Sequence, residues 1–331
     1  MGWQAAASPR LSNPVFQSLS TKNGLPQDIV NDIVLSEDGF VWIATEGGLV
    51  RWDGVRAKRV EGPNNSIVDA SIYKLSLKGK ESLWFSVYGR GVFYLDLATQ
   101  KIEQIEPTSY RDIKSYVQHA ESFYWQSANQ IIIALAEEVQ RFNTQTNTLE
   151  TVARLPDKFL DNNQSIRAAI SIDDTLLIAT TSGVFTKDVN NPSQSLSELN
   201  YLGEIPKNLD NYNAKFLMVD NQDRVWITTV QGVFVAEKTN FLAQLQGKKE
   251  GAFTQAVSDR NVWTMVQHKS DGFWMGTNKG LYELNKTANG WQYEHILEPH
   301  NGSTEISNKK ISAIAKDESG NLWLSSVYAG A

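Results

Sequence analysis

The sequence contains no cysteine among its 331 residues. A disulfide scaffold, a thiolate zinc site, an iron–sulfur cluster and a cysteine nucleophile are therefore excluded. Histidine is nearly as scarce, and the four present do not cluster in the sequence: His119, His268, His295 and His300. No phosphate loop, dinucleotide fingerprint, G-x-S-x-G or H-E-x-x-H motif occurs. We therefore expect neither a metal site nor a cofactor.

Long apolar runs and basic runs are missing as well. The longest apolar stretch, residues 131–136, has the length of a strand and lies far below the roughly 18 residues of a membrane span. Acidic residues outnumber basic ones by 37 to 31, and the net charge is −6. We therefore expect no membrane insertion of this chain and no binding to nucleic acid.

What the sequence does contain is a repeat. The segment DGFVWIATEGGLV at residues 38–50 returns as DRVWITTVQGVF at 223–234 and as GFWMGTNKGLY at 272–282, with shorter or weaker copies elsewhere. The anchor positions of the copies are 42 to 49 residues apart: Trp42, Trp84, Ile132, Leu177, Trp226, Trp274 and Trp323. Seven units of about 47 residues account for the whole chain.

Each unit has the pattern of short β-strands. Two apolar residues separated by two others, as at 30–33 and 262–265, precede a turn rich in Asp and Gly, the anchor strand, a short turn and a further strand. Four short strands in 40 to 50 residues is the period of a propeller blade. We predict an all-β chain, a seven-bladed β-propeller formed as one domain by residues 14–331, with each anchor on the second strand of its blade.

The two ends of the chain have separate interpretations. Residues 1–13 are expected to be a tail or a signal-peptide remnant, because Ala5 and Ala7 have the spacing of an export-signal cleavage site. Vector sequence or a disordered tail is the alternative. The seventh unit ends after two strands, and an open edge strand would expose unpaired backbone groups. We therefore predict a composite last blade, closed by the N-terminal segment 15–19 as its outer strand.

The first unit resembles a known repeat. The residues GLP at 24–26, V-x-x-I at 30–33, DG-x-x-WIAT at 38–45, GL at 48–49 and WDG at 52–54 are similar to the two-component regulator propeller repeat. The match is strong in the first, sixth and seventh units and poor in the third and fourth.

The resemblance implies a function and a location. Members of this family are periplasmic or extracellular sensor propellers, attached to an inner-membrane span and to a histidine kinase or a GGDEF diguanylate cyclase. The family often adds further propeller or β-sandwich domains, which would be partners within the same protein. Neither these domains nor the output motifs occur in this sequence. The resemblance implies a non-catalytic sensor domain.

Two other functions stay open. Streptogramin-lyase-like enzymes also use a seven-bladed propeller, and a lyase needs a histidine base beside an acid and a metal on the central face. His268 lies inside a repeat, where a polar core role fits better, so a periplasmic propeller lyase or hydrolase is the alternative. A protein-interaction platform within the sensor assembly is a third interpretation.

The repeated residues themselves favour structural roles. A tryptophan required at the same position of several blades is most simply explained by packing between blades. The acids that precede the anchors favour Asx turns over calcium loops, because the D-x-D-x-D-G spacing is absent: Asp38, Asp220, Asp271 and Asp317.

The loops of one face are the predicted ligand site. In a propeller the connections that enter the inner strands and those that join the second and third strands share one face. Tyrosines interleaved with charged and amide residues suit a small polar ligand such as an oligosaccharide or a peptide. Arg90, between Gly89 and Gly91, is expected to reach the axis. The predicted ligand-binding residues are Glu46, Tyr88, Arg90, Tyr116, Arg167, Tyr212, Gln231, Lys279 and Tyr328, with Gln27 and Asp28 beside them; ordinary solvated loop residues are the alternative for each.

Overall fold

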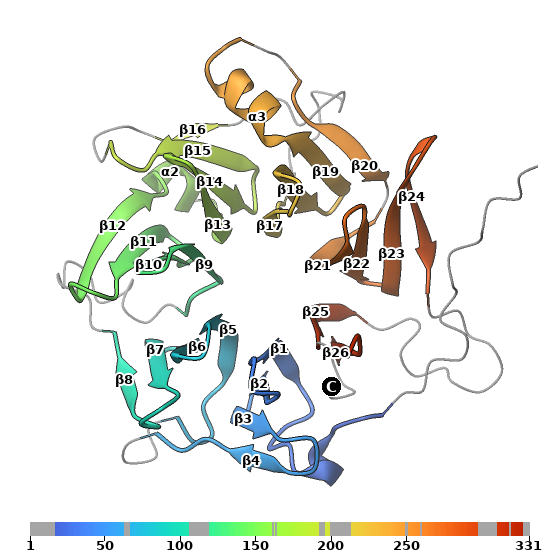
Figure 1. The fold of residues 1–331 in the computed structure, drawn as a ribbon. Coiled ribbons are helices and arrows are strands. Elements are labelled where there is room, and N and C mark those ends of the chain that lie inside the picture. Colours follow the sequence, from blue (N-terminus) through green and yellow to red (C-terminus); the bar gives the residue numbers. More distant parts are fainter. Residues whose placement is uncertain are drawn as a thin grey trace, which may run out of the picture.

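The protein forms a ring of antiparallel sheets around a central axis (Figure 1). The computed structural model describes residues 17–62, 67–105, 119–160, 162, 164–191, 196–198, 213–248, 251–258, 260–296, 310–317 and 319–326. In these residues six sheets have four strands each, and one sheet near the C-terminus has two. The fold is therefore an all-β propeller with six four-stranded blades.

The blades follow one another along the chain. Blade 1 holds β1 (Val30–Leu35), β2 (Val41–Thr45), β3 (Gly48–Trp52) and β4 (Ala57–Arg59); blade 2 holds β5 (Ile72–Lys78), β6 (Ser82–Val87), β7 (Gly91–Asp96) and β8 (Ile102–Gln104). Blade 3 holds β9 (Ser122–Ser127), β10 (Gln130–Ala134), β11 (Glu138–Asn143) and β12 (Thr148–Arg154); blade 4 holds β13 (Ile166–Ile172), β14 (Thr175–Thr180), β15 (Val184–Asp188) and β16 (Ser197–Glu198).

The remaining strands complete the ring. Blade 5 holds β17 (Phe216–Val219), β18 (Arg224–Thr229), β19 (Gly232–Glu237) and β20 (Thr254–Ser258); blade 6 holds β21 (Val262–Lys269), β22 (Gly272–Thr277), β23 (Gly280–Thr287) and β24 (Gly290–His295). The last sheet holds β25 (Ile311–Lys316) and β26 (Leu322–Ser326). Helical segments are short: a 3₁₀ turn (Thr21–Asn23), α2 (Asp157–Leu160) and α3 (Lys238–Leu245). Within the described ranges no helix is long and apolar enough to cross a membrane.

All seven anchors lie on the second strand of their sheet, as predicted. Trp42 and Trp226 are 2% and 0% exposed, and the ring of Trp226 lies 4.5 Å from that of Phe273 in the next blade. The indole N–H groups also find acceptors, since Trp226 Nε1 donates to Asp220 Oδ2 at 2.7 Å. Packing between blades therefore explains the repeated tryptophans. Trp323 is only half-buried, since it lies on the two-stranded last sheet.

Two of the four acids before the anchors, Asp220 and Asp317, accept backbone N–H groups in turns, as the Asx interpretation expected. By contrast, Asp38 accepts from Ser36 Oγ and Asp271 pairs with Arg224. Asp220 Oδ1 accepts hydrogen bonds from the backbone N–H groups of Gln222 and Arg224, both at 2.9 Å. In the last sheet, Asp317 Oδ1 accepts the backbone N–H of Asn321 at 2.7 Å. Blade 5 adds a buried ion pair, because the Arg224 guanidinium donates to Asp220 Oδ2 at 2.6 Å and to Asp271 Oδ1 of blade 6 at 2.6 Å.

The last sheet closes the ring by packing against blade 1. Strand β1 contacts both β25 and β26, and Trp323 packs against the apolar core of blade 1. Leu19 is buried in the same core, whereas Gln17–Leu19 form no strand. Val15 and Phe16 lie outside the described residues, so the predicted closing strand stays a prediction.

The buried ion pair gives a test of how blades are joined. We expect Asp220→Ala to lower the free energy of unfolding by about 3 kcal/mol, because it leaves the buried Arg224 charge with one carboxylate fewer. Asp317 accepts the matching turn hydrogen bond but forms no ion pair among the described residues. Asp317→Ala should therefore lower the free energy of unfolding by only about 1 kcal/mol. Urea unfolding followed by tryptophan fluorescence measures both values, and equal losses would contradict the role given to Arg224.

Candidate functional site

The inner strands place one residue of each blade around the axis. In five of the seven sheets the pairing register between the first and second strands shifts near the start of the first strand. In blade 1 the shift lies between Val30 and Asp32, and it recurs at the matching positions of blades 2, 4 and 6 and of the last sheet. A β-bulge re-aims the side chain that it displaces. The bulged residues, with the matching residues directly before β9 and β17, are Asn31, Tyr73, Glu121, Arg167, Lys215, Trp263 and Ser312; we call these seven the axial ring.

Members of the axial ring touch across the blade boundaries. Arg167 Nη1 of blade 4 lies 3.3 Å from Glu121 Oε1 at the start of blade 3. Lys215 Nζ lies 3.4 Å from the centre of the Trp263 ring, which comes from blade 6. Because these residues come from inner strands, which surround the centre in Figure 1, their contacts form a site at the axis.

Residues that lie two positions before an axial-ring residue in the chain contact the preceding blade. The ring of His119 lies 4.2 Å from that of Tyr73, and Lys310 Nζ lies 3.5 Å from the centre of the Trp263 ring. Asn261 Oδ1 accepts a hydrogen bond from Lys215 Nζ. Trp263 Nε1 in turn donates to Asn278 Oδ1 in the turn between β22 and β23. The axial ring is therefore fixed by side chains of the neighbouring blades.

The charges at the axis perturb each other. Burial first, and then the charges of Lys310 and Arg167, lower the pKa of Lys215 to about 8. Burial and the charges of Lys74 and Arg167 also lower the pKa of Lys310. Burial opposes ionisation of Glu121, but the hydrogen bond from His119 and the charge of Arg167 outweigh it and lower the pKa of Glu121. The site therefore holds an ionised carboxylate among several close cations.

Two of the predicted site residues belong to one contact chain. The exposed ring of Tyr88, in the turn between β6 and β7, lies 5.0 Å from that of His119. His119 Nε2 lies 3.4 Å from Glu121 Oε1, and Glu121 pairs with Arg167. Tyr88 and Arg167, predicted from separate units, are thus linked through His119 and Glu121.

The other predicted residues are more dispersed. Glu46 and Lys279 are exposed in turns between second and third strands, and Gln231 is half-buried in the matching turn of blade 5. Arg90 is exposed, and its carbonyl oxygen accepts a hydrogen bond from Gln104 Nε2 of the outermost strand β8 at 2.7 Å. Tyr116, Tyr212 and Tyr328 lie outside the described residues.

Most of the axial cluster lies outside the site predicted from the sequence: Lys215, Lys310 and Trp263 are not among the predicted residues. The V-x-x-I pattern carries a signal for the axial ring, because the residue after its first apolar position is the axial-ring residue of that unit, such as Asn31 or Trp263. Aligning that position across the units would have brought together residues of very different chemistry.

His268 has the structural role that the sequence suggested. Its Nε2 lies 3.0 Å from Glu283 Oε1, and its ring stacks on Trp274 with centres 4.7 Å apart, inside blade 6. The hydrogen bond from His268, ahead of that from Lys269, lowers the pKa of Glu283 to about 2 against the opposing effect of burial. Among the described residues no group of three His, Asp or Glu side chains could hold a metal ion.

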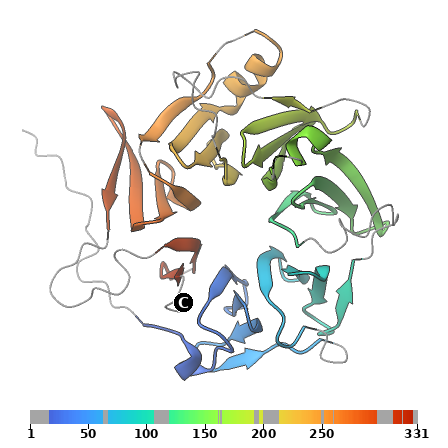
Figure 2. The ribbon, with the colours of Figure 1, turned by 180° about the vertical axis from the view of Figure 1, so that it is seen from behind.

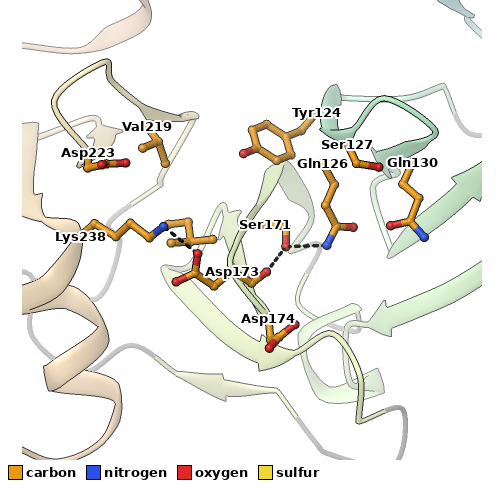
Figure 3. A pocket seen from close by; sticks show the side chains of 11 residues that line it. Tyr124, Gln126, Ser127, Gln130, Ser171, Asp173, Asp174, Val219, Asp223 and Lys238 are labelled. Carbon is orange, nitrogen blue, oxygen red and sulfur yellow. Dashed lines mark hydrogen bonds and ion pairs between the residues drawn. The ribbon is translucent and has the colours of Figure 1, made fainter.

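The opposite face carries an acidic pocket of about 540 Å³ (Figure 3). It is lined by the inner strands and the following turns of blades 3, 4 and 5, which are neighbours in the ring (Figure 2), and by Lys238. These turns follow the inner strands, whose first residues carry the axial ring, so the pocket lies on the other face. Lys238 Nζ, at the start of α3, pairs with Asp173 Oδ1 at 2.7 Å, and Gln126 Nε2 donates to Ser171 Oγ. The carboxylates of Asp174 and Asp223 also line this pocket, so the two faces differ in charge.

Comparisons with known proteins give structural neighbours only. No family model matches the chain, and no curated protein matches it. Among solved structures, the extracellular domains of two B. thetaiotaomicron proteins, assigned as a hybrid two-component system and a one-component system, each match with a TM-score of 0.71 and 18% identity. They cover 95% of this chain, which spans 41% and 39% of their own length. What they share is the propeller fold.

An enzyme is a further neighbour. Streptogramin B lyase matches with a TM-score of 0.67 and 14% identity, over 92% of this chain and 93% of the lyase chain. At these identities the comparisons establish the β-propeller fold and leave the chemistry to the residues of the site.

The lowered pKa of Lys215 predicts an unusually reactive amine. With a pKa of about 8, about half of the Lys215 side chains are neutral at pH 8, while an ordinary lysine with a pKa near 10.4 is almost fully protonated. We expect trace acetylation, read by peptide mass spectrometry across pH, to show a midpoint near pH 8 at Lys215.

Lys101 provides the control, because its hydrogen bond to Glu103 raises the pKa of Lys101. Its midpoint should lie well above that of Lys215. Arg167→Ala removes a nearby positive charge and should move the Lys215 midpoint upward. Identical profiles at Lys215 and Lys101 would contradict the electrostatic description of the axis.

Proposed function

We propose that this chain is the extracytoplasmic sensor domain of a bacterial transmembrane signalling protein, non-catalytic, which recognises a polar ligand on the axial face. One observation carries the proposal. The fold fills the same inner-strand position seven times, yet the axial ring contains Asn, Tyr, Glu, Arg, Lys, Trp and Ser. A position with a purely structural task would be filled by similar residues, as the anchor is, whereas recognition of one ligand requires different groups at fixed places.

The surroundings of the domain follow from the same proposal. The domain would stand in the periplasm as part of an inner-membrane protein, with a histidine kinase or a diguanylate cyclase as output and further propeller or β-sandwich domains beside it. The family resemblance of the first unit and the likeness to extracellular domains of signalling systems support this assignment. The reading frame of the gene should therefore continue into a membrane span and an output domain.

A propeller lyase is the second candidate. His119 and Glu121 form a histidine–carboxylate pair at the axis, and streptogramin B lyase matches over nearly its whole chain. We rank it second because His119 Nε2 faces Glu121 while the Glu121 carboxylate is also held by Arg167.

We also propose that the last sheet is a seventh, composite blade that residues 15–19 complete. The last sheet has its own second-strand anchor, Trp323, and it packs beside β1. Deleting residues up to Thr21 should lower the melting temperature by several degrees, because it removes a closing strand and the buried Leu19. Deleting only residues 1–13 is the matched control and should leave the melting temperature unchanged. An unchanged melting temperature after the longer deletion would refute closure by this segment.

The sensor proposal predicts a binding site without turnover. We expect one member of a panel of neutral oligosaccharides, acidic oligosaccharides and short peptides to bind in calorimetry. Tyr88→Ala should weaken that binding about tenfold, because an aromatic platform next to His119 is lost. Arg90→Ala belongs in the same series and tests whether this arginine reaches the ligand.

The controls separate the two candidate functions. Tyr293→Ala removes a tyrosine from the outer strand β24, where its hydroxyl donates to the carbonyl oxygen of Ser258, and should leave binding unchanged. Mass spectrometry of the same mixtures should detect no product. Turnover of a glycan or a lactone antibiotic that His119→Ala abolishes would replace the sensor by the lyase. If Tyr88→Ala and Arg90→Ala both keep full affinity for a bound ligand, the ligand site is not on this part of the axial face.

A further inference from the structure

We propose that the axial site binds its ligand through an oxyanion, a carboxylate, sulfate or phosphate group, that contacts the ammonium groups of Lys215 and Lys310. The inference rests on the proposed sensor function, because it names the ligand class of the same site. It follows from the balance of charge at the axis, from the way the two ammonium groups are held, and from the contrast with the opposite face.

The axis carries more cations than its carboxylates neutralise. Lys74 Nζ lies 3.8 Å from Asp32 Oδ2, and Arg167 Nη1 lies 3.3 Å from Glu121 Oε1. Each of these carboxylates therefore already has a cationic partner. Among the residues that the structure describes, neither Lys215 nor Lys310 has a carboxylate within 4 Å.

The carboxylates at the axis are also tied down by other contacts. Glu121 is 8% exposed and its Oε1 contacts His119 Nε2. Both of its carboxylate oxygens also accept hydrogen bonds from Arg167 Nη1, Oε1 at 3.3 Å and Oε2 at 3.4 Å. Asp32 Oδ2 accepts the backbone N–H of Leu75 at 3.0 Å, which links blade 1 to blade 2. Neither side chain can turn to the two lysines without breaking a link between blades.

The two ammonium groups are instead held by an aromatic ring. Lys215 Nζ and Lys310 Nζ lie 3.4 and 3.5 Å from the centre of Trp263, within the range of cation–π attraction. Trp263 is itself anchored by its hydrogen bond to Asn278. Two half-buried like charges fixed beside one ring are unfavourable in the free protein, and an anion that contacts them offsets part of this cost.

The perturbed lysines agree with this geometry. The charges of Lys310 and Arg167 contribute to the lowered pKa of Lys215, after burial. A bound anion would stabilise the charged form and raise the pKa of Lys215 again. The pocket on the opposite face suits an anion less, because Asp173, Asp174 and Asp223 outnumber its one lysine, Lys238, which is paired with Asp173.

The experiment uses matched acidic and neutral probes on the whole chain. Calorimetric titrations with tri-galacturonate and with its fully methyl-esterified trimer compare a carboxylate ligand with a neutral one of the same shape. Galactose 6-sulfate, galactose 6-phosphate and galactose then distinguish the type of oxyanion. We expect the acidic member of at least one set to bind about tenfold or more tightly than its neutral partner.

Two lysine variants connect that difference to the axis. Lys215→Met and Lys310→Met should each weaken binding of the acidic probe about tenfold and leave the neutral probe unchanged. Lys286→Met is the matched control, because Lys286 is an exposed lysine whose Nζ lies 5.7 Å from the Trp291 ring in blade 6. Acidic probes should also protect Lys215 from trace acetylation at pH 8, as a direct readout at the site.

The outcomes distinguish this inference from the sensor proposal. Equal affinity for acidic and neutral probes, or acidic binding that both lysine variants retain, overturns the oxyanion site. Binding of a neutral oligosaccharide that only Tyr88→Ala weakens overturns it too and leaves the sensor proposal standing. Binding of none of these probes, nor of any member of the peptide panel, overturns both.

Discussion

Burial of the second strand on both of its faces is the constraint on which the rest of the structure depends. Every residue of β2, β6, β18 and β22 is buried. Alternate side chains of these strands therefore point to two apolar neighbours, and neither face of the strand meets water. A sheet buried on both faces needs a neighbour on each side, and a closed ring gives each sheet two. The tryptophan anchors fill the wide space between blades, and nearby polar side chains accept hydrogen bonds from their indole N–H groups where burial removes water: Asp220 for Trp226, Ser36 for Trp42 and Ser82 for Trp84.

This rigid middle layer leaves the ends of the strands free for other tasks. In five of the seven sheets a bulge near the start of the inner strand turns one side chain out of the regular alternation. Neighbouring blades then fix such side chains by direct contacts, as Glu121 at the start of blade 3 does with Arg167. The axial ring is thus built on strands and not on long loops, which suits recognition because the groups keep fixed distances.

The parts that the sequence predicted are those that depend on repetition. The propeller architecture and the place of each anchor follow from spacing and apolar pattern, because the same packing problem recurs in every blade. Trp323, on the last sheet, departs from the expected burial and is only half-buried. The helix α3, inserted between β19 and β20, has no counterpart in the parts of the other blades that the structure describes, and it left no periodic signal.

The candidate site was only partly predictable, for a related physical reason. Tyr88 and Arg167 were named because turns and strand entries face the axis, but their link through His119 and Glu121 depends on contacts between units far apart in the sequence. The lysines at the axis escaped notice because Lys215 and Lys310 directly precede β17 and β25, where the strand alternation that assigns a residue to a face does not apply.

The two faces of the ring have different charge, and this difference matters for how the domain meets a ligand. The chain carries a net charge of −6, so an anionic ligand is repelled by the molecule as a whole. The cations nevertheless gather at the axis, while Asp173, Asp174 and Asp223 line the opposite pocket. Screening limits charge effects to about 8 Å at physiological salt, so an approaching anion responds to the local cluster more than to the net charge. Under the proposed oxyanion site, a negatively charged group would therefore dock on the axial face and not at the acidic pocket.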